Sequence, residues 1–311
     1  MIDLTENRCL EEIQRTIKKG IAVSEKDNYD SAINIFNQVI KCQQAMALAY
    51  IQRGRCHWEM RRWQEAVENF EVASQLDPGN ADVRWTSCLM HLQLNDFEKG
   101  WKHIESRWHS DKFDSPRLHT KKARWKRYDF CEELFVWSEQ GLGDQILYSS
   151  MLPALRPYVT KKITVMLDAR LIPLYQRAFP DMDFIPQNAR VSGIDAQIPL
   201  GSIGAQFISK LDDIPKTRAE KFLAASLERV EETQKFINKK DGEFILGVSW
   251  ASAAPRIGDH KSIALDELRP ILSMPGVRPV LLQYGDHQKA LMDYVFKYKQ
   301  PFDMVPDLNL K

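Results

Sequence analysis

The first third of the chain repeats small and aromatic positions every 34 residues. Three aromatic, three small and three apolar positions recur in fixed phase. They are Tyr29, Trp63 and Phe97; Ala32, Ala66 and Gly100; and Phe36, Phe70 and Ile104. A unit of this length is a helix hairpin that cannot bury its apolar side alone, so neighbouring copies must stack. The pattern therefore predicts an all-helical repeat domain over residues 1–115.

This repeat resembles the tetratricopeptide (TPR) family, which has the same period. The second copy matches best, at Tyr50, Gly54, Trp63, Ala66, Phe70, Ala73 and Pro78. The resemblance implies a concave groove that binds a peptide or a partner protein. Polar and cationic positions on the first helix of each hairpin are the candidates to line it: Lys19, Gln52, Arg53 and Arg55. A solvated helix face explains the same side chains, so both interpretations stay open.

Short apolar runs alternate with amphipathic segments in the rest of the chain. Strands are predicted at 134–136, 162–167, 182–185, 196–200, 243–250 and 278–285, and helices at 145–155, 171–179, 221–238, 266–272 and 287–298. Such alternation is typical of βαβ units in a parallel sheet. We therefore expect one full Rossmann-like domain over residues 131–240 and part of a second one over residues 241–311.

Between the repeats and the sheet, residues 116–130 form a basic linker. Six Lys or Arg residues lie between Arg117 and Arg127, with Trp125 and Tyr128 among them. Basic residues interleaved with aromatic ones suit single-stranded nucleic acid. The net charge of +1 and the lack of a nucleic-acid motif favour instead a connector whose aromatic residues dock on a neighbouring domain.

Composition indicates the cellular compartment of the protein but does not indicate its activity. No apolar run approaches the roughly 18 residues of a membrane span, and the N-terminus lacks the apolar region of a signal peptide. The five cysteines are scattered and include no Cys-x-x-Cys pair. We therefore expect reduced thiols, a cytoplasmic protein and no metal site.

A glycine-rich turn separates the first buried strand from the helix that follows. The segment Trp137–Asp144 is predicted to run from strand through tight turn to helix, which exposes backbone N–H groups to an anion or a polar substrate. Asp144 stands where that helix begins, so it either caps the helix or faces the cleft. Position 146 is isoleucine, so Gly141 and Gly143 do not complete the dinucleotide-binding Gly-x-Gly-x-x-Gly pattern.

The segment 138–146, followed by Leu152 and Pro153, resembles a bacterial family that joins TPR repeats to a GT-B glycosyltransferase domain related to heptosyltransferases. Segments 247–251, 261–263 and 282–285 resemble the second domain of that family. The resemblance implies transfer of a sugar from a nucleotide-sugar donor to an acceptor held by the repeats, with no metal and no further cofactor.

The same resemblance assigns roles to residues. Asp144 is the base that takes the acceptor proton, in a turn formed with Glu139, Gln140, Gly141 and Gly143. Arg256, Lys261 and Ser262 bind the donor diphosphate, and Trp250 and Gln283 line the donor cleft. Two alternatives stay open: Asp144 as an N-cap worth about 1 kcal/mol, and Arg256 and Lys261 as solvated loop residues.

The second α/β half contains only two predicted strands, whereas the resemblance implies more. A two-strand half buries little surface. The alternative function is therefore a non-enzymatic TPR scaffold whose α/β part is an incomplete or degenerate glycosyltransferase-like domain.

Overall fold

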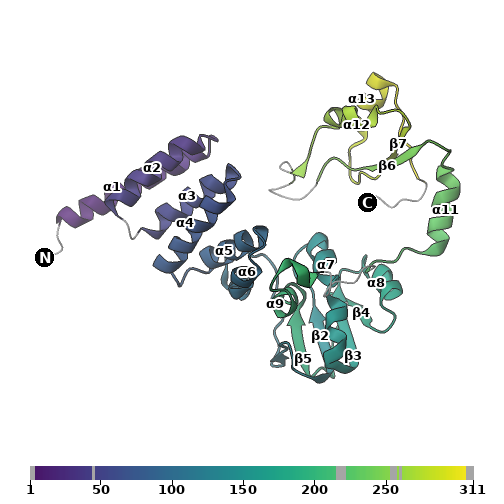
Figure 1. The fold of residues 1–311 in the computed structure, drawn as a ribbon, viewed down its shortest axis with the longest axis horizontal. Coiled ribbons are helices and arrows are strands. Elements are labelled where there is room, and N and C mark those ends of the chain that lie inside the picture. The colour runs from purple at the N-terminus through teal and green to yellow at the C-terminus, as the bar shows by residue number, and fades with distance from the viewer. Residues whose placement is uncertain (1–3, 44–45, 215–221, 253–257, 259–260, 306–311) are drawn as a thin grey trace. The chain divides into compact units, whose positions relative to one another are not determined.

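A computed structural model describes residues 4–43, 46–214, 222–252, 258 and 261–305 (Figure 1). The chain divides into two compact units, Met1–Ala224 and Ala225–Lys311. The repeats and the first sheet therefore share one unit, although the sequence suggested separate domains joined by a linker. Among the described helices, none has both the length and the apolar character that a membrane span requires.

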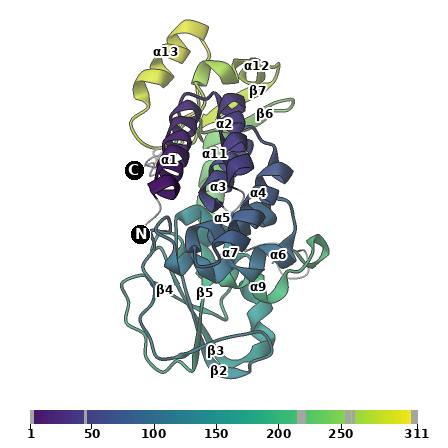
Figure 2. The ribbon, with the colours of Figure 1, turned by 90° about the vertical axis from the view of Figure 1, so that its left-hand side faces the viewer.

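Helix hairpins form the N-terminal part of the first unit, as the 34-residue period predicts (Figures 1 and 2). The helices are α1 (Leu4–Ser24), α2 (Tyr29–Cys42), α3 (Ala47–Glu59), α4 (Trp63–Leu76), α5 (Ala81–Gln93) and α6 (Phe97–Lys102). The third hairpin differs from the others because α6 is short and is followed by the 3₁₀ helix η1 (Ile104–His109).

The small repeat positions let the helices approach closely. A Cβ atom at Gly20 would lie 2.5 Å from the Phe36 ring, and one at Gly54 would lie 2.8 Å from the Phe70 ring. Larger residues would therefore push the paired helices apart. This contact explains why small and aromatic positions share one period.

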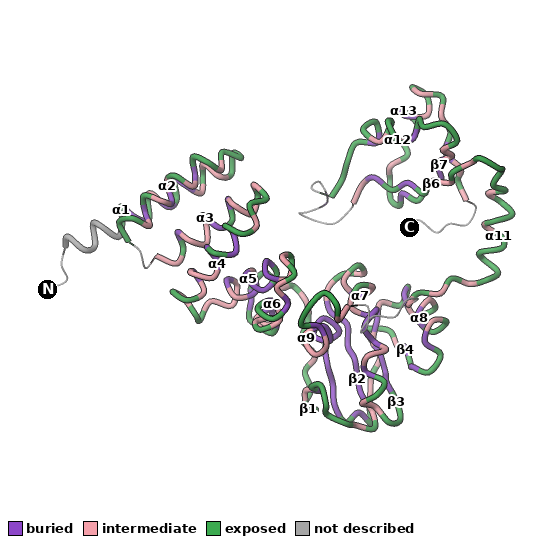
Figure 3. Tube along the Cα trace, viewed as in Figure 1, coloured by how far each residue is buried: buried purple, intermediate pink, exposed green. Residues whose placement is uncertain are grey.

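A five-stranded parallel sheet follows the repeats. Its strands are β1 (Ala123–Arg124), β2 (Cys131–Trp137), β3 (Val159–Leu167), β4 (Asp183–Pro186) and β5 (Ala196–Pro199), in the order β1-β5-β2-β3-β4. Its short helices are α7 (Leu142–Ser149), η2 (Leu152–Tyr158), α8 (Ile172–Ala178), η3 (Leu200–Ser202), α9 (Gly204–Phe207) and η4 (Leu211–Asp213). Buried residues concentrate in the central strands (Figure 3). The chain leaves β2 towards β3 and β4 and returns on the other side as β5, so the strand order reverses between β2 and β5.

The predicted linker 116–130 is part of this sheet, because it contributes the edge strand β1. Trp125 is only 1% exposed and packs against Tyr158 and Phe207. Its indole N–H donates to the carbonyl of Asp129. Trp125 is therefore a docking residue, as the connector interpretation predicts, and is not available to stack on a base.

The second unit contains the two-stranded parallel sheet of β6 (Phe244–Val248) and β7 (Val277–Leu281). Its helices are α11 (Leu227–Ile237), η6 (Leu265–Leu268), α12 (Arg269–Leu272) and α13 (Gln288–Tyr298). A small core forms around Trp250, Leu272 and Tyr294. The helix predicted from residue 221 begins only at Leu227, where the Ser226 side chain accepts from the N–H of Arg229 and caps it.

Candidate functional site

The turn after β2 has the predicted strand–turn–helix form. Gly141 occupies the N-cap position of α7, and Gln140 has a positive φ of 63°. Ser115 accepts a hydrogen bond from the backbone N–H of Gln140 at 3.0 Å. The side chain of Gln145 donates to the carbonyl of Gln140 at 3.3 Å and accepts from the N–H of Asp168 at 2.9 Å. These contacts fix the turn at the carboxyl end of β2.

Asp144 is the third residue of α7 and is half-buried. It is not the N-cap, because Gly141 holds that position, and α7 has no side-chain capping bond. A Cβ atom built on Gly143 would meet no atom of the described residues within 4 Å, apart from its chain neighbours and the backbone of its own helix. Gly143 and Asp144 thus lie at an accessible edge of the sheet, where the role of Asp144 as a base stays a prediction.

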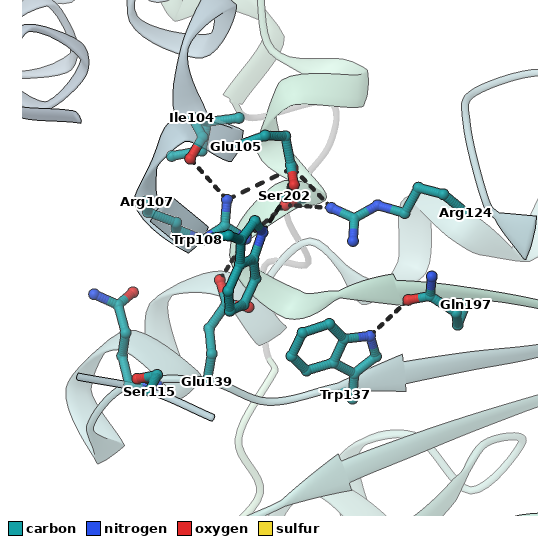
Figure 4. A network of polar contacts seen from close by, with 11 residues as sticks. Ile104, Glu105, Arg107, Trp108, Ser115, Arg124, Trp137, Glu139, Gln197 and Ser202 are labelled. Carbon is teal, nitrogen blue, oxygen red and sulfur yellow. Dashed lines mark hydrogen bonds and ion pairs between the residues drawn. The ribbon is translucent and has the colours of Figure 1, made fainter. Parts of the chain in front are cut away.

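Glu139 points into the protein, towards Arg107 (Figure 4). Its carboxylate lies 2.7 Å from the guanidinium of Arg107, and the two side chains are 0% and 1% exposed. The resemblance places Glu139 in an open turn on the acceptor side. In the structure its side chain lies inside the protein instead. It binds an arginine that comes from the last repeat.

Arg107 and Glu139 belong to a larger polar group, which we call the Arg107 network: Glu105, Arg107, Arg124, Glu139 and Ser202 (Figure 4). Arg107, Glu139 and Ser202 are buried in it, whereas Arg124 is half-buried and Glu105 is exposed. The hydroxyl of Ser202 accepts from Arg107 at 2.8 Å and from Arg124 at 2.9 Å, and it donates to Glu105 at 2.6 Å. Arg124 also donates to Glu105 at 2.7 Å. Two cations and two carboxylates thus neutralise one another where η1, β1, the turn after β2 and η3 meet.

The pKa values of the two carboxylates shift in opposite directions. Desolvation raises the pKa of Glu139 to about 7, although the charge of Arg107 acts in the opposite direction. Desolvation also acts on Glu105, but the charges of Arg107 and Arg124 and the hydroxyl of Ser202 hold its pKa below the usual value. Among the described residues, Glu139 Oε2 and Arg107 Nε have no hydrogen-bond partner. The Arg107–Glu139 pair is therefore the costly part of the network.

Sequence reasoning missed the importance of Arg107, although the sequence carries a signal for it. The period of 34 places Arg107 in register with Val39 and Ala73, which are 2% and 0% exposed. A cation at a repeat position that is buried in the other copies needs a buried counter-charge. The sequence does not say that Glu139 supplies it.

The predicted groove residues of the repeats lie in different surroundings. Lys19 and Arg55 are exposed, and Gln52 is half-buried. Arg53 binds the neighbouring helices, because its guanidinium donates hydrogen bonds to Asn37 Oδ1 at 2.6 Å and to Asn69 Oδ1 at 2.7 Å. Arg53 thus ties α3 to α2 and α4.

The predicted donor-side residues form a hydrogen-bonded loop in the second unit. Gln283 is 4% exposed, and its side-chain oxygen Oε1 accepts hydrogen bonds from the backbone N–H groups of Trp250 and Ala251, both at 2.8 Å. Its amide donates to the carbonyls of Ala251 and Tyr284 at 3.0 and 2.8 Å. Trp250 is itself 5% exposed. Both predicted cleft residues are therefore buried inside this unit, and their role in a donor cleft stays a prediction.

The predicted phosphate-binding residues are only partly described. Ser262 uses its hydroxyl inside the loop, because it accepts from the N–H of Ser252 and donates to the carbonyl of Gly258. Lys261 is exposed. Arg256 lies outside the described residues. In the part of the chain that the structure describes, no three His, Cys, Asp or Glu residues are placed to hold a metal ion.

Comparison with known families supports the first part of this architecture. Residues 47–80, which hold α3 and α4, match the family model of the tetratricopeptide repeat, so this hairpin is a TPR repeat. The chain thus combines a helical, TPR-like N-terminal part with a parallel-sheet α/β region.

Two curated proteins are similar to the chain. Protein FlbA of Caulobacter vibrioides is 26% identical over 287 residues, which cover 84% of this chain and 47% of FlbA. NADPH oxidase activator 1 of Rattus norvegicus is 30% identical over 69 residues, which cover 22% of this chain and 16% of that protein. The chain thus spans less than half the length of either relative. The similarity to FlbA extends beyond the repeats into the α/β region, because it covers far more than the first third of the chain.

Solved structures give matches to about a third of the chain. The second TPR of Spaghetti (RPAP3), bound to an HSP90 peptide, has 16% identity and a TM-score of 0.31 and covers 33% of this chain and 95% of its own. PcrH in complex with the chaperone binding region of PopB has 17% identity and a TM-score of 0.30 and covers 32% of this chain and 80% of its own.

Proposed function

We propose that the chain is a protein-interaction scaffold whose TPR repeats bind a segment of a partner protein. The observation that carries this proposal is the TPR repeat at 47–80. Stacked helix hairpins present extended surfaces, which suit the recognition of peptides and partner proteins. The first sheet then acts as a rigid base for the repeats.

The Arg107 network supports a structural role for the α/β part. Ligands of open parallel sheets bind beyond the carboxyl ends of the strands, where the strand order reverses. Here that place lies after β2 and β5, and Glu139 and Ser202 stand there. Both bind Arg107 of the protein's own last repeat. A small ligand would have to displace a buried, neutralised ion pair from this part of the crevice.

The binding face is proposed to include Lys19 and Arg55, the exposed cations on α1 and α3. A partner segment with carboxylates would complement them. The test is to pan a displayed random-peptide library against the full chain and to measure the affinity of the selected peptides. The double variant Lys19→Glu/Arg55→Glu should weaken the selected acidic peptides by about tenfold or more.

The matched control is Lys41→Glu/Lys102→Glu, which changes the same charge at exposed positions on the second helices α2 and α6. It should leave the affinity within about twofold. Equal losses in both variants would show a general charge effect. A library that yields no binding peptide would count against the scaffold function.

A second candidate function is sugar transfer, which the accessible edge at Gly143 and Asp144 favours. A half-buried carboxylate at the carboxyl end of a central strand is well placed to take a proton from an acceptor hydroxyl. A thermal-shift measurement against nucleoside diphosphates and their sugars tests it, since a ligand at about 100 times its dissociation constant adds about 2.7 kcal/mol. Transfer that is retained by Asp144→Asn would remove this residue as the base.

A further inference from the structure

An apolar groove lies between the last repeat and the first sheet. It encloses about 350 Å³, and Leu89, Leu92 and Trp101 line it from α5 and α6. Leu147 of α7, Met151 and Ile208 line it from the sheet side. The groove therefore belongs to neither part alone.

Its two most exposed leucines come from different elements. Leu89 on α5 is 40% exposed, and Leu147 on α7 is 59% exposed. Leucines left at a concave surface cost free energy unless something covers them. Two such leucines from distant parts of the sequence that line the same groove indicate a surface used for binding.

The groove continues the face of the repeats that carries the first helices. The period of 34 places Leu89 of α5 in register with Arg55 of α3. Equivalent repeat positions lie on the same face of the stack. The face that is cationic at Arg55 therefore becomes apolar at the third repeat.

An acidic hollow adjoins the groove at Phe97. Phe97 also lines a neighbouring hollow of about 410 Å³, together with Asp96, Glu98, Lys210 and Asp212. Asp96 lies 3.2 Å from His91, so it is already engaged. Glu98 and Asp212 are exposed and have no ion-pair partner among the described residues. These two carboxylates form a rim that attracts cationic side chains.

We propose that this groove docks an amphipathic segment of a partner protein, with its apolar residues against Leu89 and Leu147 and its Lys or Arg residues at Glu98 and Asp212. An amphipathic helix laid in a groove anchors through apolar residues at i, i+3, i+4 and i+7. The proposal rests on the scaffold function and adds a second surface to it, because the cationic positions Lys19 and Arg55 suit acidic segments. The two surfaces thus differ in the charge that they select.

The test measures the binding of a fluorescent probe peptide to the full chain by anisotropy. The probe has leucines at helical spacing on one face and lysines on the other. Two matched peptides replace either the lysines by glutamates or the leucines by serines. The Leu/Lys probe should bind, and each replacement should weaken binding by about tenfold or more.

Protein variants then locate the site. Leu89→Glu and Leu147→Glu should each weaken the Leu/Lys probe by about tenfold or more. Leu76→Glu is the matched control, because Leu76 is 38% exposed and lies outside the groove, and it should leave binding within about twofold. Glu98→Lys/Asp212→Lys should weaken the lysine probe and improve binding of the glutamate peptide by about threefold.

Each other outcome overturns the proposal. Equal binding of all three peptides, or equal losses in Leu76→Glu and Leu147→Glu, would mean that no such groove selects them. If the wild type sediments as a dimer and Leu147→Glu sediments as a monomer, the groove binds a second copy of this chain and not a partner protein. The lysine probe could also lose binding in Lys19→Glu/Arg55→Glu and keep it in Leu147→Glu. That result would keep the scaffold function but refute this groove.

Discussion

At the scale of single residues, Arg107 links the last repeat to the first sheet. It occupies a repeat position that is filled by Val39 and Ala73 in the other copies, and it is 1% exposed. An arginine there cannot stay unpaired, because a buried charge without a partner costs several kcal/mol. Glu139 supplies the counter-charge at 2.7 Å, and the Trp108 ring lies 4.3 Å from the Arg107 guanidinium carbon. One substitution in a repeat thus creates an attachment point to the sheet.

The raised pKa of Glu139 predicts a specific pH dependence of stability. Its pKa is about 7 in the folded protein, above the usual value of 4.5, so the folded state holds a proton that the unfolded state releases. Raising the pH from about 4.5 to about 7 should therefore lower the contribution of Glu139 to the unfolding free energy, by at most about 1.4 kcal/mol per pH unit.

Urea unfolding at several pH values, in wild type and in Glu139→Gln, isolates this contribution. The wild-type free energy minus that of Glu139→Gln should fall as the pH rises through this window, and it should be constant below it. A difference that rises with pH would mean that Arg107 lowers the pKa of Glu139 more than burial raises it.

At the scale of elements, most helices and strands could be predicted because their signals are local. The apolar run before the glycine turn is β2, and the runs at 162–167 and 196–200 are β3 and β5. The contacts of Glu139 and Gln283 could not be predicted, because they depend on segments far away in the chain. The sequence pattern predicts too early a start for α11, because the Ser226 side chain caps the helix and it begins only at Leu227.

Two glycines near the turn should respond to alanine in opposite ways. A Cβ at Gly201 would lie close to Glu139 Oε1, which Arg107 pins in place, and so would strain the ion pair. Gly143 lies in α7 with free space around it among the described residues, and helical glycine costs up to about 1 kcal/mol relative to alanine.

We therefore expect Gly201→Ala to lower the unfolding free energy by about 1–3 kcal/mol and Gly143→Ala to leave it unchanged or raise it by up to about 1 kcal/mol. Chemical denaturation of both variants in the same buffer measures this contrast. If Gly201→Ala proves as stable as Gly143→Ala, the carboxylate of Glu139 is not held as tightly as its contacts indicate.

At the scale of the whole molecule, the repeats and the first sheet belong to one unit, Met1–Ala224. Repeat arrays alone have weak long-range cooperativity, since each copy contacts only its neighbours. The Arg107 network gives the last repeat a second set of contacts, to β1, the turn after β2 and η3. The third hairpin should therefore be more stable than a terminal repeat usually is.

Arg107→Ala should break this coupling, because it leaves Glu139 buried without its partner and costs about 3–5 kcal/mol. Hydrogen exchange followed by mass spectrometry should then show α5 and α6 opening before β2, whereas in the wild type these elements open together. The double variant Arg107→Met/Glu139→Gln removes both charges and should recover much of the lost stability, since a buried ion pair contributes little net stability over neutral residues of similar size. If the double variant is no more stable than Arg107→Ala, the loss comes from the shape of the arginine and its packing on Trp108, and the charge pair is not what joins the repeats to the sheet.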